Sequence, residues 1–273
     1  MKLFIHTIFI LRENIYFLEE WIDYHLLLGV DHFYLYDNSK SIGRNGSTPT
    51  TNKYNINFLK LTADISDEEL DERFNNIISK YKGHITVVDW QPKNKNNEIC
   101  YGQKESILHY LKNTPSIDSW TAFVDIDEFI FSRFELKNLI TILDFNNFSD
   151  IILHQRKFDD RFNNLRCPVT KITKCIAGLD TSMWAPKHII KHENFDTARV
   201  MNTWNIHHLP VICGYNTYCD ATGKNLRFNH YNTNAAQLEW MDSFYKSEKN
   251  FAFNSNCTEL LDRYNEMRSG SFK

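Results

Sequence analysis

Strand-like and helix-like segments alternate through the first part of this chain, and that order restricts it to few folds. Short apolar runs with strand character occupy 3–11, 30–37, 84–90, 120–127 and 150–156. Helical spacing marks 14–29, 66–83, about 99–112 and 135–143. Such alternation predicts an α/β fold with a mostly parallel sheet covered on both faces. Later segments predict a surface loop at 40–57, short strands at 187–192 and 210–214, and a last helix at 235–249.

Two further sequence patterns set the limits of these elements. Ser66 followed by Glu69 is a capping-box pattern, which predicts that the helix at 66–83 begins there. Gly29 follows the apolar face of the helix at 14–29 and is typical of a helix end. No internal repeat or linker interrupts the order, so we expect one domain over 1–273.

Composition excludes several classes of function. The 273 residues carry a formal net charge of -3, which gives no general attraction to nucleic acid. No run reaches the ~18–20 apolar residues that span a bilayer. Lys2 and the apolar run after it resemble a signal peptide only superficially, because no small-residue cleavage site follows. We therefore expect a soluble, cytoplasmic protein of bacterial or viral type, and the oligomeric state is not predicted.

The 6 cysteines are scattered and form no C-x-x-C pair. This spacing indicates neither a zinc cluster nor a thioredoxin-like motif, and it favours reduced thiols in the core. If the protein is secreted, the alternatives are a bridge between Cys167 and Cys175 or one between Cys213 and Cys219.

Three acids stand where the strand predicted at 120–127 ends, in the stretch FVDIDEFIF. If the strand continues through them, Asp125 and Asp127 share a face and Ile126 points into the core. Carboxylates this close repel each other unless a proton or a cation lies between them, and their oxygens suit Mg²⁺ or Mn²⁺. The alternative is that one acid caps a turn while another pairs with Arg133 or Lys137.

A second polar group, Asp37 to Ser39, ends the strand predicted at 30–37. In parallel sheets the ligand crevice lies at the carboxyl ends of the strands, so both polar groups are expected to share one crevice. The alternative for Asp37 is a turn formed with the two residues that follow it. Arg12, Glu13 and Asn14 follow the first strand and would line the same crevice, where the Arg12 guanidinium suits phosphate.

Several segments together resemble the GT-A glycosyltransferases, particularly family 92 and its family 2-like relatives. They are NIYFLEEWIDYHLLLGVDHFYLYDNS, WTAFVDIDEFI, KHIIK and NHYNTNAAQLEW, with Gln103 where the family has a helical glutamine. The resemblance implies a single GT-A domain, with the nucleotide-sugar part at about 1–130 and the acceptor part at about 131–273. The segment KFDDRFNNLRCP departs from the family pattern.

The same resemblance implies an activity. The enzyme would transfer a sugar from a nucleoside-diphosphate donor, UDP-linked, to a saccharide hydroxyl of an oligosaccharide or glycan, with inversion. Mn²⁺ or Mg²⁺ would be the cofactor, and Asp127 would coordinate it directly. His230 would be the third metal ligand, in preference to His207 and His208. Asp125 would approach the ribose or the ion, and Glu128 would contact the donor or support the site.

The remaining roles are less specific. Lys246 would help to hold the diphosphate, unless it belongs to a solvated helix face. Inversion needs a carboxylate that takes the acceptor's proton. The candidates are Asp159 and Asp160, after the strand at 150–156, and Asp180, each of which is otherwise an ordinary surface acid. Trp184 and Trp204 would stack on sugar rings or pack in the core.

Two other functions remain open at this level. The first is a carbohydrate-binding protein built on a degenerate transferase scaffold. The second is a phosphohydrolase of the haloacid-dehalogenase type, in which D-x-D lies on the first strand and is followed by Thr or Val. Here the motif lies in the middle of the chain and Phe129 occupies that place, which argues against the phosphohydrolase.

Overall fold

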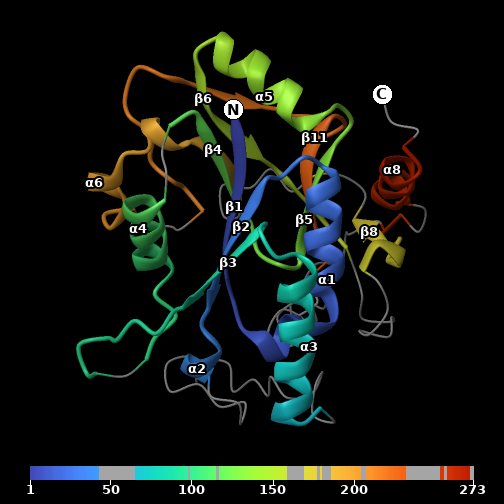
Figure 1. Ribbon diagram of the computed structural model, residues 1–273. Coiled ribbons are helices and arrows are strands. Elements are labelled where there is room, and N and C mark those ends of the chain that lie inside the picture. The colour runs from blue at the N-terminus through green and yellow to red at the C-terminus, as the bar shows by residue number, and fades with distance from the viewer. Residues whose placement is uncertain are drawn as a thin grey trace.

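A seven-stranded sheet forms the centre of the protein, in the order β10-β6-β9-β4-β1-β2-β3 (Figure 1). The computed structural model describes residues 1–42, 65–97, 99–114, 117–158, 169–176, 179, 186–203, 207–231, 253–254 and 257–270. The strands of this sheet are β1 Lys2–Phe9, β2 His32–Asp37, β3 Ile85–Asp89, β4 Ser119–Phe123, β6 Phe148–Leu153, β9 Lys187–Lys191 and β10 Asn216–Cys219.

Two smaller sheets and a set of helices complete the described part of the chain. The order in one small sheet is β5-β11-β7, and the other pairs β12 with β8. Their strands are β5 Glu128–Ser132, β7 Gln155–Lys157, β8 Cys175–Ile176, β11 Leu226–His230 and β12 Phe253–Asn254. The helices are α1 Leu11–Leu27, α2 Ser39–Ile42, α3 Asp67–Lys80, α4 Gln103–Asn113, α5 Leu136–Phe145, α6 Thr197–Val200 and α8 Glu259–Arg268.

The strand directions confirm the predicted α/β fold with a mostly parallel sheet. β1 runs parallel to β2 and β4, and β2 runs parallel to β3. β9 is inserted antiparallel between β4 and β6. The strand predicted at 187–192 is therefore confirmed as β9. The one predicted at 210–214 is wrong, because Val211 makes a single bridge to Phe195 and the strand is β10, a few residues later.

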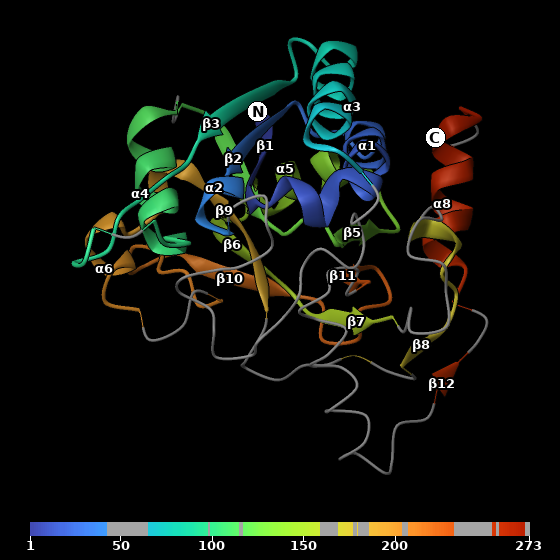
Figure 2. The same cartoon turned by 90° about the horizontal axis from the view of Figure 1, so that it is seen from below.

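Helices cover both faces of the sheet. α1 and α3 lie side by side on one face, and α4 and α6 lie on the other, as the two views show (Figures 1 and 2). The predicted helix start is confirmed, since the Ser66 side chain accepts a hydrogen bond of 3.1 Å from the Glu69 N–H. Gly29, after α1, has a φ of 103°, a left-handed conformation that costs glycine little.

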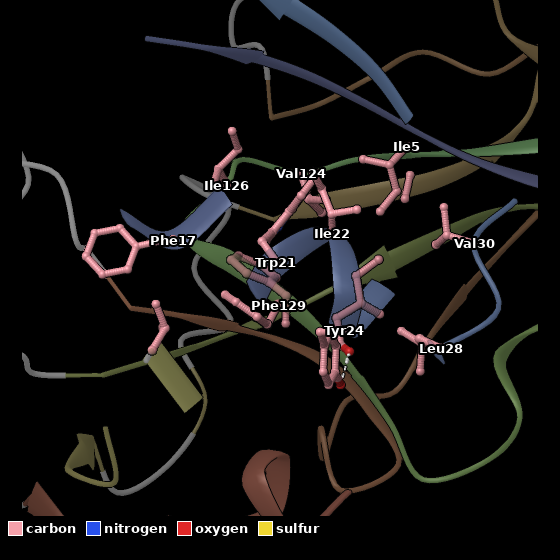
Figure 3. Packing of buried hydrophobic residues seen from close by; sticks show 14 of the residues in the cluster. Ile5, Phe17, Trp21, Ile22, Tyr24, Leu28, Val30, Val124, Ile126 and Phe129 are labelled. Carbon is pink, nitrogen blue, oxygen red and sulfur yellow. Dashed lines mark hydrogen bonds between the residues drawn. The ribbon is translucent and has the colours of Figure 1, made fainter. Parts of the chain in front are cut away.

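The main core lies between α1 and the strands, and it also fixes β5 (Figure 3). Trp21 is fully buried and its indole N–H donates to the Glu128 carbonyl at 2.8 Å. The Tyr24 hydroxyl donates to the Ile130 carbonyl at 2.8 Å, and the His25 Nε2 accepts from the Ile130 N–H at 3.2 Å. Burial lowers the pKa of His25 to about 3, so its ring is neutral and can accept that bond. These three contacts set the position of Glu128, the first residue of β5.

Cysteine pairing differs from the prediction of reduced thiols. Cys175 and Cys257 form a disulfide with their Cα atoms 6.1 Å apart, whereas Cys213 and Cys219 are free. Pairing of β8 with β12 brings the two cysteines together, and the Cys257 N–H donates to the Thr173 carbonyl at 2.9 Å. The sequence did not reveal this pair because its members are 82 residues apart. The alternative bridge between Cys167 and Cys175 is also wrong, because Cys175 is paired with Cys257, and Cys167 itself lies outside the described residues.

Within the described residues, no helix has the length and apolar character needed to cross a membrane. Most of the surface loop predicted at 40–57 and all of the helix predicted at 235–249 lie outside the described part of the chain.

Candidate functional site

The chain leaves β4 earlier than the sequence predicts. The strand ends at Phe123, so the predicted strand through 127 is wrong in its last residues. Residues 124–127 turn instead, and the Glu128 N–H donates to the Asp125 carbonyl at 3.0 Å across that turn. Ile126 is buried as predicted. The acids at 125 and 127 therefore do not share a strand face, and they have different partners.

Lys187 is the partner of Asp125. Its Nζ lies 2.7 Å from Asp125 Oδ2 and 2.9 Å from Glu128 Oε2, and its side chain is only 9% exposed. The antiparallel pairing of Phe123 with His188 brings this lysine to the end of β4. The basic partner of Asp125 is therefore neither Arg133 nor Lys137, the two residues considered from the sequence. Lys137 pairs instead with Asp31, with its Nζ 2.8 Å from Asp31 Oδ1.

Glu128 also stabilises the turn. Its Oε2 accepts the N–H of Asp125 at 2.8 Å, in addition to the ammonium of Lys187. The Glu128 carboxylate therefore caps the turn, which is the role that the alternative interpretation gave to one of the three acids. It also begins β5 directly after the turn.

Asp127, Glu128 and His230 form a group that suits a metal ion. Each offers one ligand atom, and these atoms lie within 4.8 Å of one another. His230 Nε2 lies 3.4 Å from Asp127 Oδ2, and its Nδ1 lies 3.2 Å from Gln155 Oε1. The antiparallel register of β11 with β5 places His230 opposite Glu128. Two of the three predicted ligands, Asp127 and His230, meet here, while Asp125 lies on the side of Lys187.

The donor set indicates which ions fit. Two carboxylate oxygens and an imidazole nitrogen suit Mn²⁺, and the carboxylates also suit Mg²⁺. Glu13, in the first turn of α1, is 8% exposed, and its Oε1 makes no hydrogen bond. Burial and then the charge of Asp127 raise the pKa of Glu13 to about 8. Glu13 therefore keeps its proton at neutral pH, which reduces the repulsion between its carboxyl group and the charge of Asp127.

The two carboxyls next to Lys187 differ in their protonation. Burial raises the pKa of Glu128 to about 7, although Lys187 opposes that rise. Burial also acts to raise the pKa of Asp125, but the ammonium of Lys187 outweighs it and the net direction is down. Burial acts to lower the pKa of Lys187, and its two acidic partners raise it overall. Asp125 and Lys187 thus form a charged pair at neutral pH.

A pocket opens beside this pair. Gln103, the first residue of α4, lines it together with His6, Asp125, Lys187 and His207. Of the two adjacent histidines His207 and His208, His207 lines this pocket. Burial, followed by the charge of Lys187, lowers the pKa of His207 to about 4, so its ring is neutral at pH 7.

Three residues predicted for the nucleotide pocket make local structural contacts. The Asp37 carboxylate accepts the Ser39 N–H at 2.9 Å and its hydroxyl, which is the turn considered as the alternative. Arg12 donates to the Ile65 carbonyl at 3.1 Å and to Asp67 at 2.5 Å, which links α1 to the start of α3. The Asn14 side chain donates to the Ile10 carbonyl at 2.8 Å.

Other predicted residues lie outside the described part of the chain. They are the candidate bases Asp159, Asp160 and Asp180, the diphosphate candidate Lys246, and the tryptophans Trp184 and Trp204. Lys187 is the central residue of the site that the sequence did not assign. A signal was present, because this lysine begins the segment KHIIK, which contributed to the family resemblance without receiving a role.

Residues 65–268 match the profile of the family described as glycosyltransferase family 92, a range that includes the turn at 125–128, Lys187 and His230. No curated protein matches this chain.

Several solved structures are similar in their chain path. One is 4-diphosphocytidyl-2C-methyl-D-erythritolsynthase from Anaerococcus prevotii DSM 20548, with 11% identity, coverage of 90% of this chain and 96% of that chain, and a TM-score of 0.38. Another is residues 1–349 of TarS from S. aureus, with 14% identity, coverage of 85% and 61%, and a TM-score of 0.41. A third is UDP-glucose pyrophosphorylase from Acinetobacter baumanii, with 8% identity, coverage of 97% and 92%, and a TM-score of 0.35.

Proposed function

The chain belongs to glycosyltransferase family 92, and from this premise we propose that it is a metal-dependent, inverting enzyme. It moves a sugar from a nucleoside-diphosphate donor, UDP-linked, to a hydroxyl group of a saccharide acceptor. The observation that carries this proposal is the group formed by Asp127, Glu128 and His230, whose ligand atoms lie within 4.8 Å of one another. Asp125, which precedes this group by two residues, lines the pocket.

Electrostatics support the need for a cation at this place. Asp125 is balanced by Lys187, and the pKa of Glu13 is raised to about 8, so the negative charge that an anionic diphosphate meets belongs to Asp127 and in part to Glu128. At an effective dielectric constant of 20, two like unit charges 4 Å apart repel by about 4 kcal/mol. In the proposed enzyme Asp127, Glu128 and His230 hold Mn²⁺ or Mg²⁺, which when bound supplies the positive charge that stabilises the leaving diphosphate.

The residues in the pocket bind and orient the donor in this proposal. Asp125 stays ionised beside Lys187, so it can accept hydrogen bonds from the hydroxyl groups of a ribose or a sugar. The amide of Gln103 and the neutral imidazole of His207 each offer both a donor and an acceptor. Deprotonation of the acceptor hydroxyl is assigned to one of Asp159, Asp160 and Asp180, as the sequence predicts.

Donor hydrolysis in the absence of an acceptor tests the proposal. The purified chain is incubated with a panel of UDP-, GDP- and CMP-linked sugars, with Mn²⁺ or with EDTA, and the released nucleotide is measured. We expect release from a UDP-sugar that requires the ion and is lost in Asp127→Asn. Equal release in EDTA would contradict metal dependence. Tight sugar binding with no release from any donor would favour the sugar-binding protein instead.

A further inference from the structure

We propose that Lys187 is an internal counter-cation that competes with the divalent ion for the acids of the site. It holds Asp125 and one oxygen of Glu128, and so it leaves the ion Asp127, the other oxygen of Glu128 and His230. This inference rests on the proposed function, because it concerns the same metal group.

The position of the ammonium carries the argument. Lys187 Nζ lies between two carboxylates, 2.7 Å from Asp125 Oδ2 and 2.9 Å from Glu128 Oε2. Glu128 is at the same time a member of the metal group. In this proposal the Glu128 carboxylate is thus shared between Lys187, which is always present, and a divalent ion that exchanges with solvent. The two cations draw on the same negative charge.

The surroundings of Lys187 prevent it from moving away easily. Its side chain is only 9% exposed, and the backbone of β9 is paired on both sides, with β4 and with β6. The acidic partners of Lys187 are also fixed in place. The Glu128 carboxylate accepts a hydrogen bond from the Asp125 N–H, and the Glu128 backbone carbonyl accepts one from the Trp21 indole N–H. The ion therefore binds beside a fixed positive charge, which weakens its binding.

This arrangement has a consequence for turnover. A nucleoside diphosphate leaves together with the charge that neutralises it, so an ion held too tightly by the acids of the site would slow product release. A resident lysine lowers the affinity for the free ion, and the diphosphate then contributes ligands of its own while it is bound. The ion is therefore held more weakly by the free protein than by the protein with a donor bound.

The test is calorimetric titration of Mn²⁺ alone into the full chain after removal of metals with EDTA. The variants are Lys187→Met, Lys187→Arg and the double variant Lys187→Met/Asp125→Asn. Lys191→Met is the matched control, because Lys191 is on the same strand and also pairs with two acids, Asp144 and Glu193. Thermal unfolding of each variant, with and without Mn²⁺, checks the fold.

We expect Lys187→Met to bind Mn²⁺ at least about tenfold more tightly than the wild type, since a like charge next to the ion is gone. Lys187→Arg and Lys191→Met should stay within about threefold of the wild type, because both keep the charge pattern of the site. Adding Asp125→Asn to Lys187→Met should remove the gain, because the freed Asp125 provides it. Should Lys187→Met fail to fold, Lys187→Gln keeps hydrogen-bond donors without the charge and must show the same direction.

Other outcomes overturn the inference. If Lys187 only supports the structure of the site, its replacement should leave the affinity for Mn²⁺ unchanged or lower it. Unchanged or weaker Mn²⁺ binding in Lys187→Met or Lys187→Gln therefore refutes the competition. If the wild type binds Mn²⁺ and hydrolyses a UDP-sugar in that case, only this inference fails. If no variant binds Mn²⁺, the inference and the metal dependence of the proposed function fail together.

Discussion

The two ends of strand β9 carry the same chemical motif in different settings. At one end, Lys187 pairs with Asp125 and Glu128, and its side chain is 9% exposed. At the other end, Lys191 pairs with Asp144 at 2.8 Å and with Glu193 at 3.0 Å, and its side chain is 19% exposed. Each lysine has one partly exposed partner, Asp125 at 38% and Asp144 at 27%, but the second partner differs, because Glu128 is 3% exposed and Glu193 is 53% exposed.

The two ends of β9 differ in the acidic side chains that accompany each lysine. Around Lys191 one lysine meets two acids that reach solvent, which is a common surface arrangement of small energetic value. At the Lys187 end, the partner Glu128 also belongs to the group formed with Asp127 and His230, and Asp127 and Glu128 are both buried. Buried ionisable groups with shifted pKa values are concentrated at functional sites. The proposed binding role therefore belongs to the Lys187 end, and the Lys191 end is expected to be structural.

The largest effect is expected for Asp127→Asn. Loss of this ligand should lower Mn²⁺-dependent hydrolysis of the donor by about 100-fold or more, because the leaving diphosphate loses its stabilising charge. Asp144→Asn, at the far end of β9, should leave the rate unchanged. The rates are measured as nucleotide released from a UDP-sugar at saturating Mn²⁺. Equal losses in both variants would abolish the distinction between the two ends.

The next effect concerns stability. Lys187→Met should lower the free energy of unfolding by about 3 kcal/mol in the absence of metal, because it leaves the buried Glu128 carboxylate and the partly exposed Asp125 without their cation. Mn²⁺ should restore part of this loss, since binding to the folded form stabilises it. Urea unfolding with and without Mn²⁺ measures both changes. A stability loss that Mn²⁺ does not reduce would argue that the lysine only packs.

Glu13 predicts a dependence on pH. Its pKa is raised from 4.5 to about 8 in the folded protein. Between those values the folded form keeps a proton that the unfolded form has lost, so this contribution to stability is lost as the pH rises from 4.5 to 8. Glu13→Gln should therefore gain on the wild type by roughly 3 kcal/mol between pH 5 and pH 8. Denaturant unfolding without metal tests this, with the exposed Glu193→Gln as control.

The smallest effect is expected for Lys191→Met. An ion pair of this exposure contributes about 0.5 kcal/mol, and 1 M salt should remove most of it. The measurement is the difference in urea midpoint between wild type and variant at low and high salt. A loss as large as that of Lys187→Met, insensitive to salt, would show that the two ends do not differ as described.

Much of the fold was predictable because its signals are local. β1, α1, β2, α3, β3, α4, β4, α5 and β6 all correspond to segments that the sequence predicted, since apolar spacing and caps lie within each segment. β5 and β11 were not predicted, because each is a run of five residues without clear alternation. The Cys175–Cys257 pair was missed since only the packing of distant strands brings it together.

The site was predicted in part for the same reason. Asp125 and Asp127 stand in one local motif, and His230 belongs to a segment that resembles the family. The pairing of Lys187 with Asp125 depends on the antiparallel insertion of β9 beside β4, which no local pattern reveals. The surroundings of Glu13 depend likewise on the turn at Asp127, more than 100 residues later.

Anomalous scattering from crystals soaked in Mn²⁺ tests the central claim most directly. The account predicts one strong peak within coordination distance of Asp127, Glu128 and His230, with Asp125 still bound to Lys187. An empty map at that position, or an ion bound by Asp125 with Lys187 displaced, would contradict it.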